Sequence, residues 1–197
     1  MPKGFCKGGD IVTLLKHRSF NRAQAGRDFS RVIPQSRPDS CGLAALATLM
    51  NEVLHLPTSE AALQARLKHR RPASLTDLSK LSRQAGLKAH AYAVDLDLLL
   101  RVQRPAILHM GASRRIGHYV VVRGVADDKA WLADPMRGNV HLDLTALKKH
   151  WYVPRKPFGH VLYVAGADEE WLPLNEEHLP GSPPETVSDW FPPPAGR

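Results

Sequence analysis

Hydrophobic positions recur at helical spacing in the first half of the chain. Five apolar residues fall on one helical face, each three or four residues from another: Leu43, Leu46, Ala47, Met50 and Leu54. This spacing predicts a buried helix that begins near residue 41. A second helix is expected over residues 60–69, and a third runs from a cap at Ser74 or Thr76 to Gly86. The first half is therefore expected to be largely helical.

The second half changes to the alternating pattern of β-strands. The expected strands are residues 88–94, 105–110, 118–123, 130–133, 139–142 and 160–164. Short helices over residues 95–102 and 145–150 lie between some of them. Helices first and strands second predict an α+β fold with an antiparallel sheet, rather than alternating βαβ units.

Composition separates the two ends of the chain from its middle. Residues 1–30 are basic and weakly periodic, so we expect an N-terminal arm before a folded domain over residues 31–166. Residues 167–197 are acidic and rich in proline, which predicts a mostly disordered tail.

Charge and cysteine content narrow the function classes. The net charge is +8, but Lys and Arg are scattered and no nucleic-acid motif accompanies them, so we interpret them as a solvated basic surface. No apolar run approaches the roughly 20 residues that span a bilayer, and the start has no secretory pattern. Cys6 and Cys41 suggest no disulfide framework. We expect a cytoplasmic protein without an integral membrane segment, although delivery into another cell would leave no trace of this kind.

Cys41 stands at the first turn of the first predicted helix. Ser40 or Asp39 is expected to cap that helix, and the positive end of the helix dipole favours a thiolate over a thiol. The alternative is a cysteine that only packs in the core. The rest of the chain decides between the two.

A cysteine nucleophile needs a base, a group that orients the base, and donors for the oxyanion. His118 opens one predicted strand, and Asp134 directly follows the next, so a hairpin brings them together. Gln35 lies six residues before Cys41, and its amide can turn over the helix start to form an oxyanion hole with the Cys41 N–H. Each catalytic role thus has a residue of the right type.

Four motifs occur in an order that resembles the double-glycine leader peptidases. The motifs are Gln35-x5-Cys41-Gly42, Pro105-x-Ile107-Leu108-His109, Gly117-His118-Tyr119-Val120-Val121-Val122 and Asp134-Pro135-x-x-Gly138. The family consists of papain-like cysteine peptidases, usually found at the N-terminus of bacteriocin-exporting transporters, and the similarity covers about residues 31–164. It implies a papain-like α+β fold, in which the helical half with the cysteine helix packs on the sheet.

The resemblance also implies roles and a substrate. Cys41 would be the nucleophile, His118 the general base, Asp134 the orienting carboxylate and Gln35 the oxyanion donor. Cleavage would follow a Gly-Gly pair, in a site too narrow for larger side chains. The family usually has Asp directly before the cysteine, where this chain has Ser40.

No transporter segment accompanies the motifs in this sequence, so the resemblance implies a stand-alone peptidase. Its expected partner is a peptide or protein substrate, either a secretion substrate that is processed or the target of a toxin in bacterial competition. Secretion machinery and an immunity protein are further candidate partners.

Two other interpretations use the same residues. One is a catalytically silent domain that binds a leader peptide or a partner, and the other is an amidase, deamidase or acyl transferase. No cofactor or metal is expected, because His90, His141, His150 and His160 have no ligand spacing. We interpret His109 as a sheet histidine beneath the site. Gly8-Gly9 lacks the leader pattern that would make it a cleavage signal.

Overall fold

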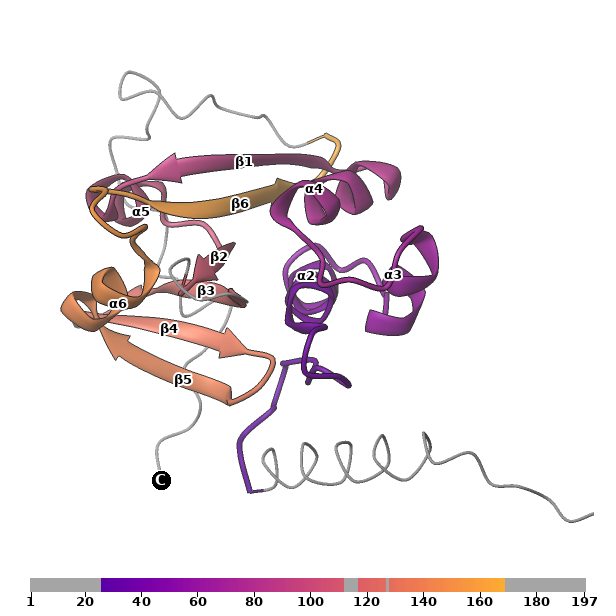
Figure 1. Cartoon of the computed structure of the whole chain (residues 1–197), viewed down its shortest axis with the longest axis horizontal. Coiled ribbons are helices and arrows are strands. Elements are labelled where there is room, and N and C mark those ends of the chain that lie inside the picture. Colours follow the sequence, from indigo (N-terminus) through magenta and orange to yellow (C-terminus); the bar gives the residue numbers. More distant parts are fainter. Residues whose placement is uncertain (1–25, 112–116, 127, 169–197) are drawn as a thin grey trace, which may run out of the picture.

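A computed structural model describes residues 26–111, 117–126 and 128–168, and it places a six-stranded sheet beside a group of helices (Figure 1). The helices are α2 (Cys41–Glu52), α3 (Glu60–Arg66), α4 (Leu75–Gln84), α5 (Leu96–Val102) and α6 (Leu144–Trp151). The strands are β1 (Lys88–Val94), β2 (Ala106–Met110), β3 (His118–Ala126), β4 (Lys129–Asp134), β5 (Gly138–Asp143) and β6 (Gly159–Ala165). The predicted α+β class, with the helical half on one side of the sheet, is confirmed.

The sheet has the strand order β1-β6-β2-β3-β4-β5, and neighbouring strands are antiparallel. The last strand in the chain, β6, pairs with both β1 and β2 and therefore lies between them. In the β3–β4 pair, Val121 lies opposite Ala133. The end of β4 therefore lies beside the start of β3, which brings Asp134 next to His118.

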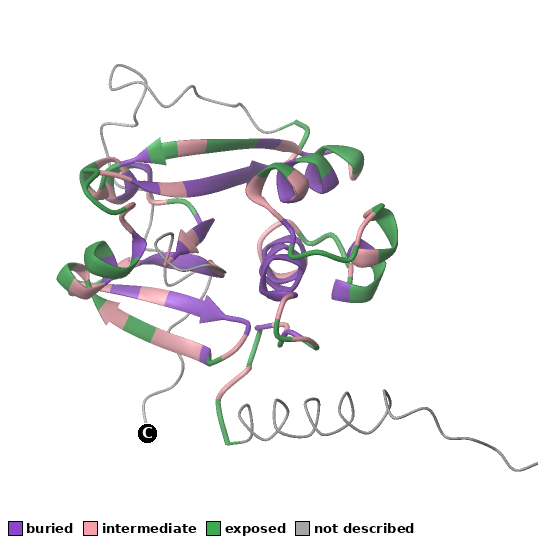
Figure 2. Cartoon of the chain, in the orientation of Figure 1, coloured by how far each residue is buried: buried purple, intermediate pink, exposed green. Residues whose placement is uncertain are grey.

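Helix α2 is the centre of the core on one face of the sheet (Figure 2). Its residues from 41 to 50 are all buried, although the sequence pattern predicted burial of one face. The difference arises because the sheet covers one side of α2 while α3 and α4 pack on the other sides. On the opposite sheet face, Leu99, Leu147 and Trp151 form a second core under α5 and α6.

The helix and strand limits differ from the prediction in a few places. Helix α3 ends at Arg66 rather than at residue 69, because Leu67 is already extended. Ser74 caps α4 in a reciprocal arrangement with Asp77, so Thr76 is not the cap. Strand β3 continues to residue 126, across a register shift that lies between Val122 and Gly124.

A short segment before the first helix is attached to the β4–β5 turn; we call residues 27–31 the N-terminal strap. Asn139 donates from its backbone N–H to Asp28 O at 2.7 Å, and its Nδ2 donates to Asp28 Oδ2 at 2.9 Å. Arg27 Nη1 donates to Met136 O at 2.9 Å. The strap thus holds both ends of the turn that follows Asp134.

Several sequence predictions fall outside the described residues, namely most of the N-terminal arm, with Cys6 and Gly8-Gly9, and the acidic tail beyond residue 168. Within the described part, the helices are all too short or too polar to cross a membrane.

Candidate active site

Cys41 is the first residue of α2 and is only 5 % exposed. It lines a cavity of about 150 Å³, the small pocket, whose other walls are Asp39, Gly42, Pro72, Ala73, His109, Gly117 and Tyr119. A Cβ atom at Gly42 would lie 3.1 Å from the Tyr119 ring. Glycine after the cysteine therefore lets the start of α2 approach the sheet closely.

Ser40 is the residue at the N-cap position of α2, but its side chain does not cap the helix. Among the described residues, the Ser40 hydroxyl donates to Arg37 O at 3.0 Å and accepts from Arg37 N at 3.1 Å. The predicted side-chain cap is therefore wrong. The hydroxyl instead closes the turn before the nucleophile.

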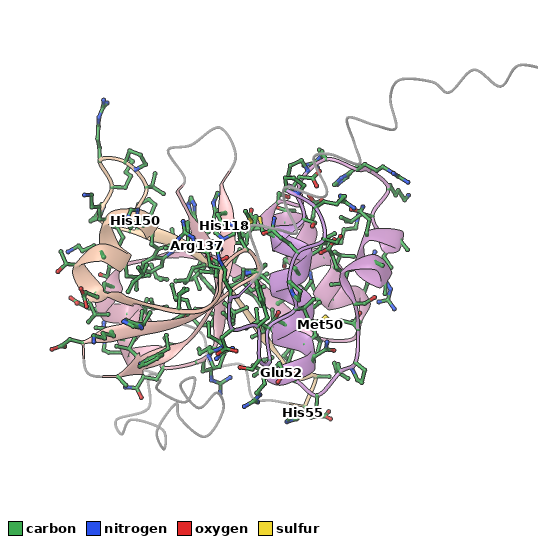
Figure 3. All side chains as sticks on the ribbon, turned by 90° about the horizontal axis from the view of Figure 1, so that it is seen from below. Met50, Glu52, His55, His118, Arg137 and His150 are labelled. Atoms are coloured by element: carbon green, nitrogen blue, oxygen red, sulfur yellow. The ribbon has the colours of Figure 1, made fainter. Side chains whose placement is uncertain are left out.

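His118 and Asp134 form a direct pair, as the sequence predicted. His118 Nε2 lies 2.8 Å from Asp134 Oδ1, and Figure 3 shows His118 at the junction between the sheet and α2. This contact leaves Nδ1 for the Cys41 thiol, whose hydrogen bond to the ring affects the His118 pKa. The structure thus brings three of the four predicted site residues into one line.

His118 and Asp134 each stabilise the charged form of the other. Burial lowers the pKa of His118, but hydrogen bonds and charges from Asp134 and Cys41 outweigh it and raise the pKa from 6.5 to about 9. Burial raises the pKa of Asp134, yet the hydrogen bond and charge of His118, with smaller effects from Met136 and Arg137, leave it lowered. A protonated imidazole beside an ionised carboxylate is the partner that a thiolate needs.

Asp134 is 2 % exposed and is held by the turn that follows it. Its Oδ1 accepts from Met136 N at 2.7 Å and from Arg137 N at 3.2 Å, and Arg137 Nε lies 3.9 Å from Oδ2. Backbone donors fix the direction of the carboxylate without competing for a proton. Asp134 can therefore hold the imidazole in one orientation.

Gln35 lies beside this turn and is 3 % exposed. Its backbone N–H donates to Pro135 O at 2.9 Å, and its Nε2 donates to Arg37 O at 2.7 Å. The amide is thus in the segment that leads into Cys41, and one of its two N–H groups donates to Arg37 O. Hydrogen bonds of catalytic groups often tighten only when substrate is bound.

Glu60 is a supporting residue that sequence analysis missed. It is 7 % exposed, and its two carboxylate oxygens accept from Ser36 N at 2.8 Å and from Ser36 Oγ at 2.6 Å. The bond joins α3 to the residue after Gln35. The sequence gives no sign of this supporting role, because acidic residues are common in the first turn of a helix, where Glu60 stands.

His109 lies on β2 beneath the site, where the sequence analysis placed it. Its ring stacks on Tyr119 with centroids 4.7 Å apart, and a Cβ atom at Gly117 would collide with the ring. Burial and the charge of His160 lower the pKa of His109. His109 therefore acts as a neutral wall of the small pocket, and the glycine before His118 makes room for it.

A model of the Peptidase C39 family matches residues 30–153. The chain belongs to the Peptidase C39 family. The probable functional amyloid protease FapD of Pseudomonas aeruginosa is 29% identical over 133 residues, which is 64% of this chain and 58% of that protein. This C39 chain thus spans less than two thirds of that relative. The family and the protease relatives together indicate a cysteine peptidase, as the sequence predicted.

Solved structures agree on the fold of this C39 domain. The peptidase domain of ComA, a bi-functional ABC transporter of Streptococcus, has a TM-score of 0.60 at 20% identity and covers 68% of this chain and 97% of that one. A double glycine motif protease from an AMS/PCAT transporter, in complex with the leader peptide, has a TM-score of 0.59 at 23% identity. That match covers 72% of this chain and 95% of the other. The predicted papain-like fold is confirmed.

Proposed function

We propose that this C39 domain cleaves a peptide after Gly-Gly by acyl transfer to Cys41. The observation that carries the proposal is the line from Cys41 through His118 to Asp134, with its 2.8 Å histidine–carboxylate contact and a His118 pKa of about 9. In this proposal Cys41 is the nucleophile, His118 the general acid and base, and Asp134 the group that orients the imidazole.

The reaction has two steps. The Cys41 thiolate attacks the scissile carbonyl carbon, and the carbonyl electron pair moves to oxygen. When the C–O double bond re-forms, the C–N bond breaks and the imidazolium of His118 gives its proton to the leaving amine. Water then attacks the thioester, His118 takes its proton, and the new carboxyl group leaves as the S–C bond breaks. The Cys41 N–H and the Gln35 amide would stabilise the oxyanion in both steps.

The small pocket supports glycine on the acyl side of the bond. It has a volume of about 150 Å³, and the stacked rings of His109 and Tyr119 form part of its wall beside Cys41. These two rings restrict the room for a side chain beside Cys41, and this favours glycine there. We therefore propose a leader peptide that ends in Gly-Gly as the substrate, with processing of a secretion substrate as the biological setting.

Labelling of the thiol tests the catalytic pair. We expect limiting iodoacetamide near pH 6 to add one label quickly to the wild type. Cys41→Ala should lack this fast label, and His118→Ala should acquire it more slowly. Intact mass gives the extent of labelling. If the wild type labels no faster than free cysteine, the site is not activated, and the interpretation as a silent binding domain takes its place.

Product masses test the reaction class. Peptides with an internal Gly-Gly should yield two fragments with the cut after the second glycine, and Gly-Ala peptides should be cleaved far more slowly. A mass gain of about one dalton without chain scission would instead indicate a deamidase on the same residues.

A further inference from the structure

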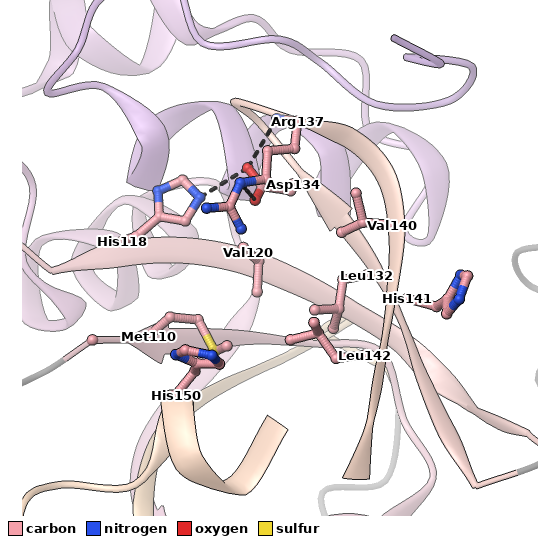
Figure 4. A pocket seen from close by; sticks show the side chains of 11 residues that line it. Met110, His118, Val120, Leu132, Asp134, Arg137, Val140, His141, Leu142 and His150 are labelled. Carbon is pink, nitrogen blue, oxygen red and sulfur yellow. Dashed lines mark hydrogen bonds and ion pairs between the residues drawn. The ribbon is translucent and has the colours of Figure 1, made fainter. Parts of the chain in front are cut away.

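A second and larger cavity adjoins His118 and is lined by residues of strands β2 to β5 (Figure 4). It has a volume of about 430 Å³, and we call it the large pocket. His118 and Asp134 line it, whereas Cys41 and Gly42 line the small pocket. Gly117 and Tyr119 line the small pocket while His118 and Val120 line the large one, so the start of β3 separates the two cavities.

The floor of the large pocket is apolar and comes from four neighbouring strands of the sheet. Its floor residues are Met110, Val120, Leu132, Val140 and Leu142. Val120 and Leu132 are 2 % exposed and belong to the core, but Val140 and Leu142 on β5 are only half-buried. The β5 side of the floor thus keeps apolar surface that an occupant could cover.

The proposed reaction fixes which part of a substrate passes this pocket. The proton of the imidazolium goes to the leaving amine, so the leaving nitrogen must lie within hydrogen-bond reach of the His118 ring. The acyl half of the substrate stays with Cys41 and the small pocket. The chain that follows the scissile bond therefore leaves across His118, toward the large pocket.

We infer that the large pocket binds an apolar side chain from the first residues after the scissile bond. The inference rests on the proposed function and adds a specificity site for the leaving segment. Glycine would be required on the acyl side by the small pocket, and a large aliphatic side chain would be preferred on the leaving side.

Charge around the large pocket favours an acidic rather than a basic leaving segment. Arg137 and His150 are exposed at its rim, and the Arg137 side chain is 66% exposed. Among the described residues that line it, Asp134 is the one carboxylate, and it is already engaged by His118 and by the backbone of its own turn. A lysine in the leaving segment would therefore find like charge and no partner, whereas an aspartate would find opposite charge.

Cleavage of a matched peptide series tests the inference. The peptides share one acyl side that ends in Gly-Gly and carry Leu, Ser or Lys directly after it. We expect the wild type to cleave the Leu peptide with a kcat/KM about tenfold to a hundredfold above that of the Ser peptide, as hydrophobic pockets discriminate. The Lys peptide should be the slowest.

Val140→Phe fills the pocket from β5 and should reduce the Leu-to-Ser ratio to about one tenth of its wild-type value or less. Leu142→Ser removes apolar floor and should lower the ratio without added bulk. Ala91→Phe, on the exposed strand β1 at the opposite edge of the sheet, adds the same ring and should keep the wild-type ratio.

A Gly-Gly chloromethyl ketone separates this inference from the proposed function, because it alkylates Cys41 without a leaving peptide. The control Ala91→Phe should react with it at the wild-type rate. Equal cleavage of the Leu and Ser peptides by wild type would overturn the leaving-side site, as would a wild-type Leu-to-Ser ratio in Val140→Phe. Absence of both cleavage and alkylation in wild type would overturn the proposed function itself, and the inference with it.

Discussion

At the scale of single residues, His118 is the side chain that interacts with both Cys41 and Asp134. The His118 ring is hydrogen-bonded to Asp134 and to the Cys41 thiol, and it lines the large pocket. The pKa of about 9 means that the imidazole is charged at neutral pH. The imidazolium of His118 and the carboxylate of Asp134 therefore form an ion pair before substrate arrives.

The pH dependence of cleavage should reflect this raised pKa. His118 can protonate the leaving amine while it is charged, so kcat/KM should fall as pH rises through about 9. The charged His118 also stabilises the folded state. This stabilisation is complete below pH 6.5 and is lost as pH rises through about 9. Asp134→Asn removes the carboxylate charge, so the alkaline limb should move to lower pH. A pH–rate profile from about pH 6 to 10 measures the limb in both proteins. An unmoved limb in Asp134→Asn would contradict the orienting role.

The oxyanion role of Gln35 predicts a loss in turnover. Gln35→Ala removes a donor near the start of α2, so kcat should fall by about 10²- to 10³-fold while KM changes little. Steady-state kinetics with a Gly-Gly peptide measures both constants. Gln84→Ala, an exposed change at the end of α4, is the matched control and should behave as wild type. A rise in KM with unchanged kcat would assign Gln35 to substrate binding instead.

Elements explain how these residues come to the same place. Helix α2 presents Cys41 from one side, strands β3 and β4 present His118 and Asp134 from the other, and the bond from Gln35 N to Pro135 O joins the two sides. The elements themselves were predictable from the spacing of apolar residues along the chain, although α2 and the strands β2, β3 and β6 are buried on more than the one face that this spacing predicts. The catalytic pair was predictable too, because two consecutive strands form a hairpin.

What the sequence did not predict depends on contacts between distant segments. Glu60 supports Ser36, and the N-terminal strap holds the turn after Asp134 through Asn139. Neither contact has a periodic or local signal, since the partners are 24 and 111 residues apart. The Ser40 side chain is a different case, because its partner Arg37 is only three residues away and the hydroxyl closes a local turn instead of capping α2.

The contact of α3 with the nucleophile segment can be tested through Glu60. Glu60→Ala removes the buried carboxylate that accepts both hydrogen bonds from the exposed residue Ser36, which should lower the free energy of unfolding by about 1–3 kcal/mol. We also expect a lower kcat, because Gln35 precedes the released residue. Chemical denaturation and steady-state kinetics give the two values.

Glu52→Ala is the control for the Glu60 variant. Glu52 pairs with Arg31 at 2.7 Å on the surface, and the Arg31 side chain is 42% exposed. Exposed pairs of this kind contribute about 0–1 kcal/mol, so this variant should stay close to wild type in stability and kcat. Equal effects of the two substitutions would contradict a special role for Glu60.

At the scale of the whole molecule, the domain is a helical half and a sheet half that share one active site. The strap also connects the N-terminal end of the described chain to the sheet half, since it reaches the β4–β5 turn. We therefore propose that the folded unit begins before residue 31, the start expected from composition. Its first residues hold the turn that carries Asp134.

Shortening the chain tests this connection. A chain that begins at Val32 lacks the strap, so it should melt at a lower temperature and turn over more slowly than one that begins at Gly26. Thermal unfolding and kcat/KM measure the two effects, and Asn139→Ala in the full chain should reproduce them in part because it removes the side-chain bonds to the strap. Identical melting of the two shortened chains would show that the strap is dispensable.

The separation of Cys41 from His118 along the chain has a consequence during protein synthesis. Cys41 leaves the ribosome with the helical half, long before strands β3 and β4, which carry His118 and Asp134, have been made. Until the hairpin of β3 and β4 docks against α2, the thiol has no imidazolium beside it. In the proposed function, the cell therefore contains a Cys41 thiol activated by His118 only after the fold is complete.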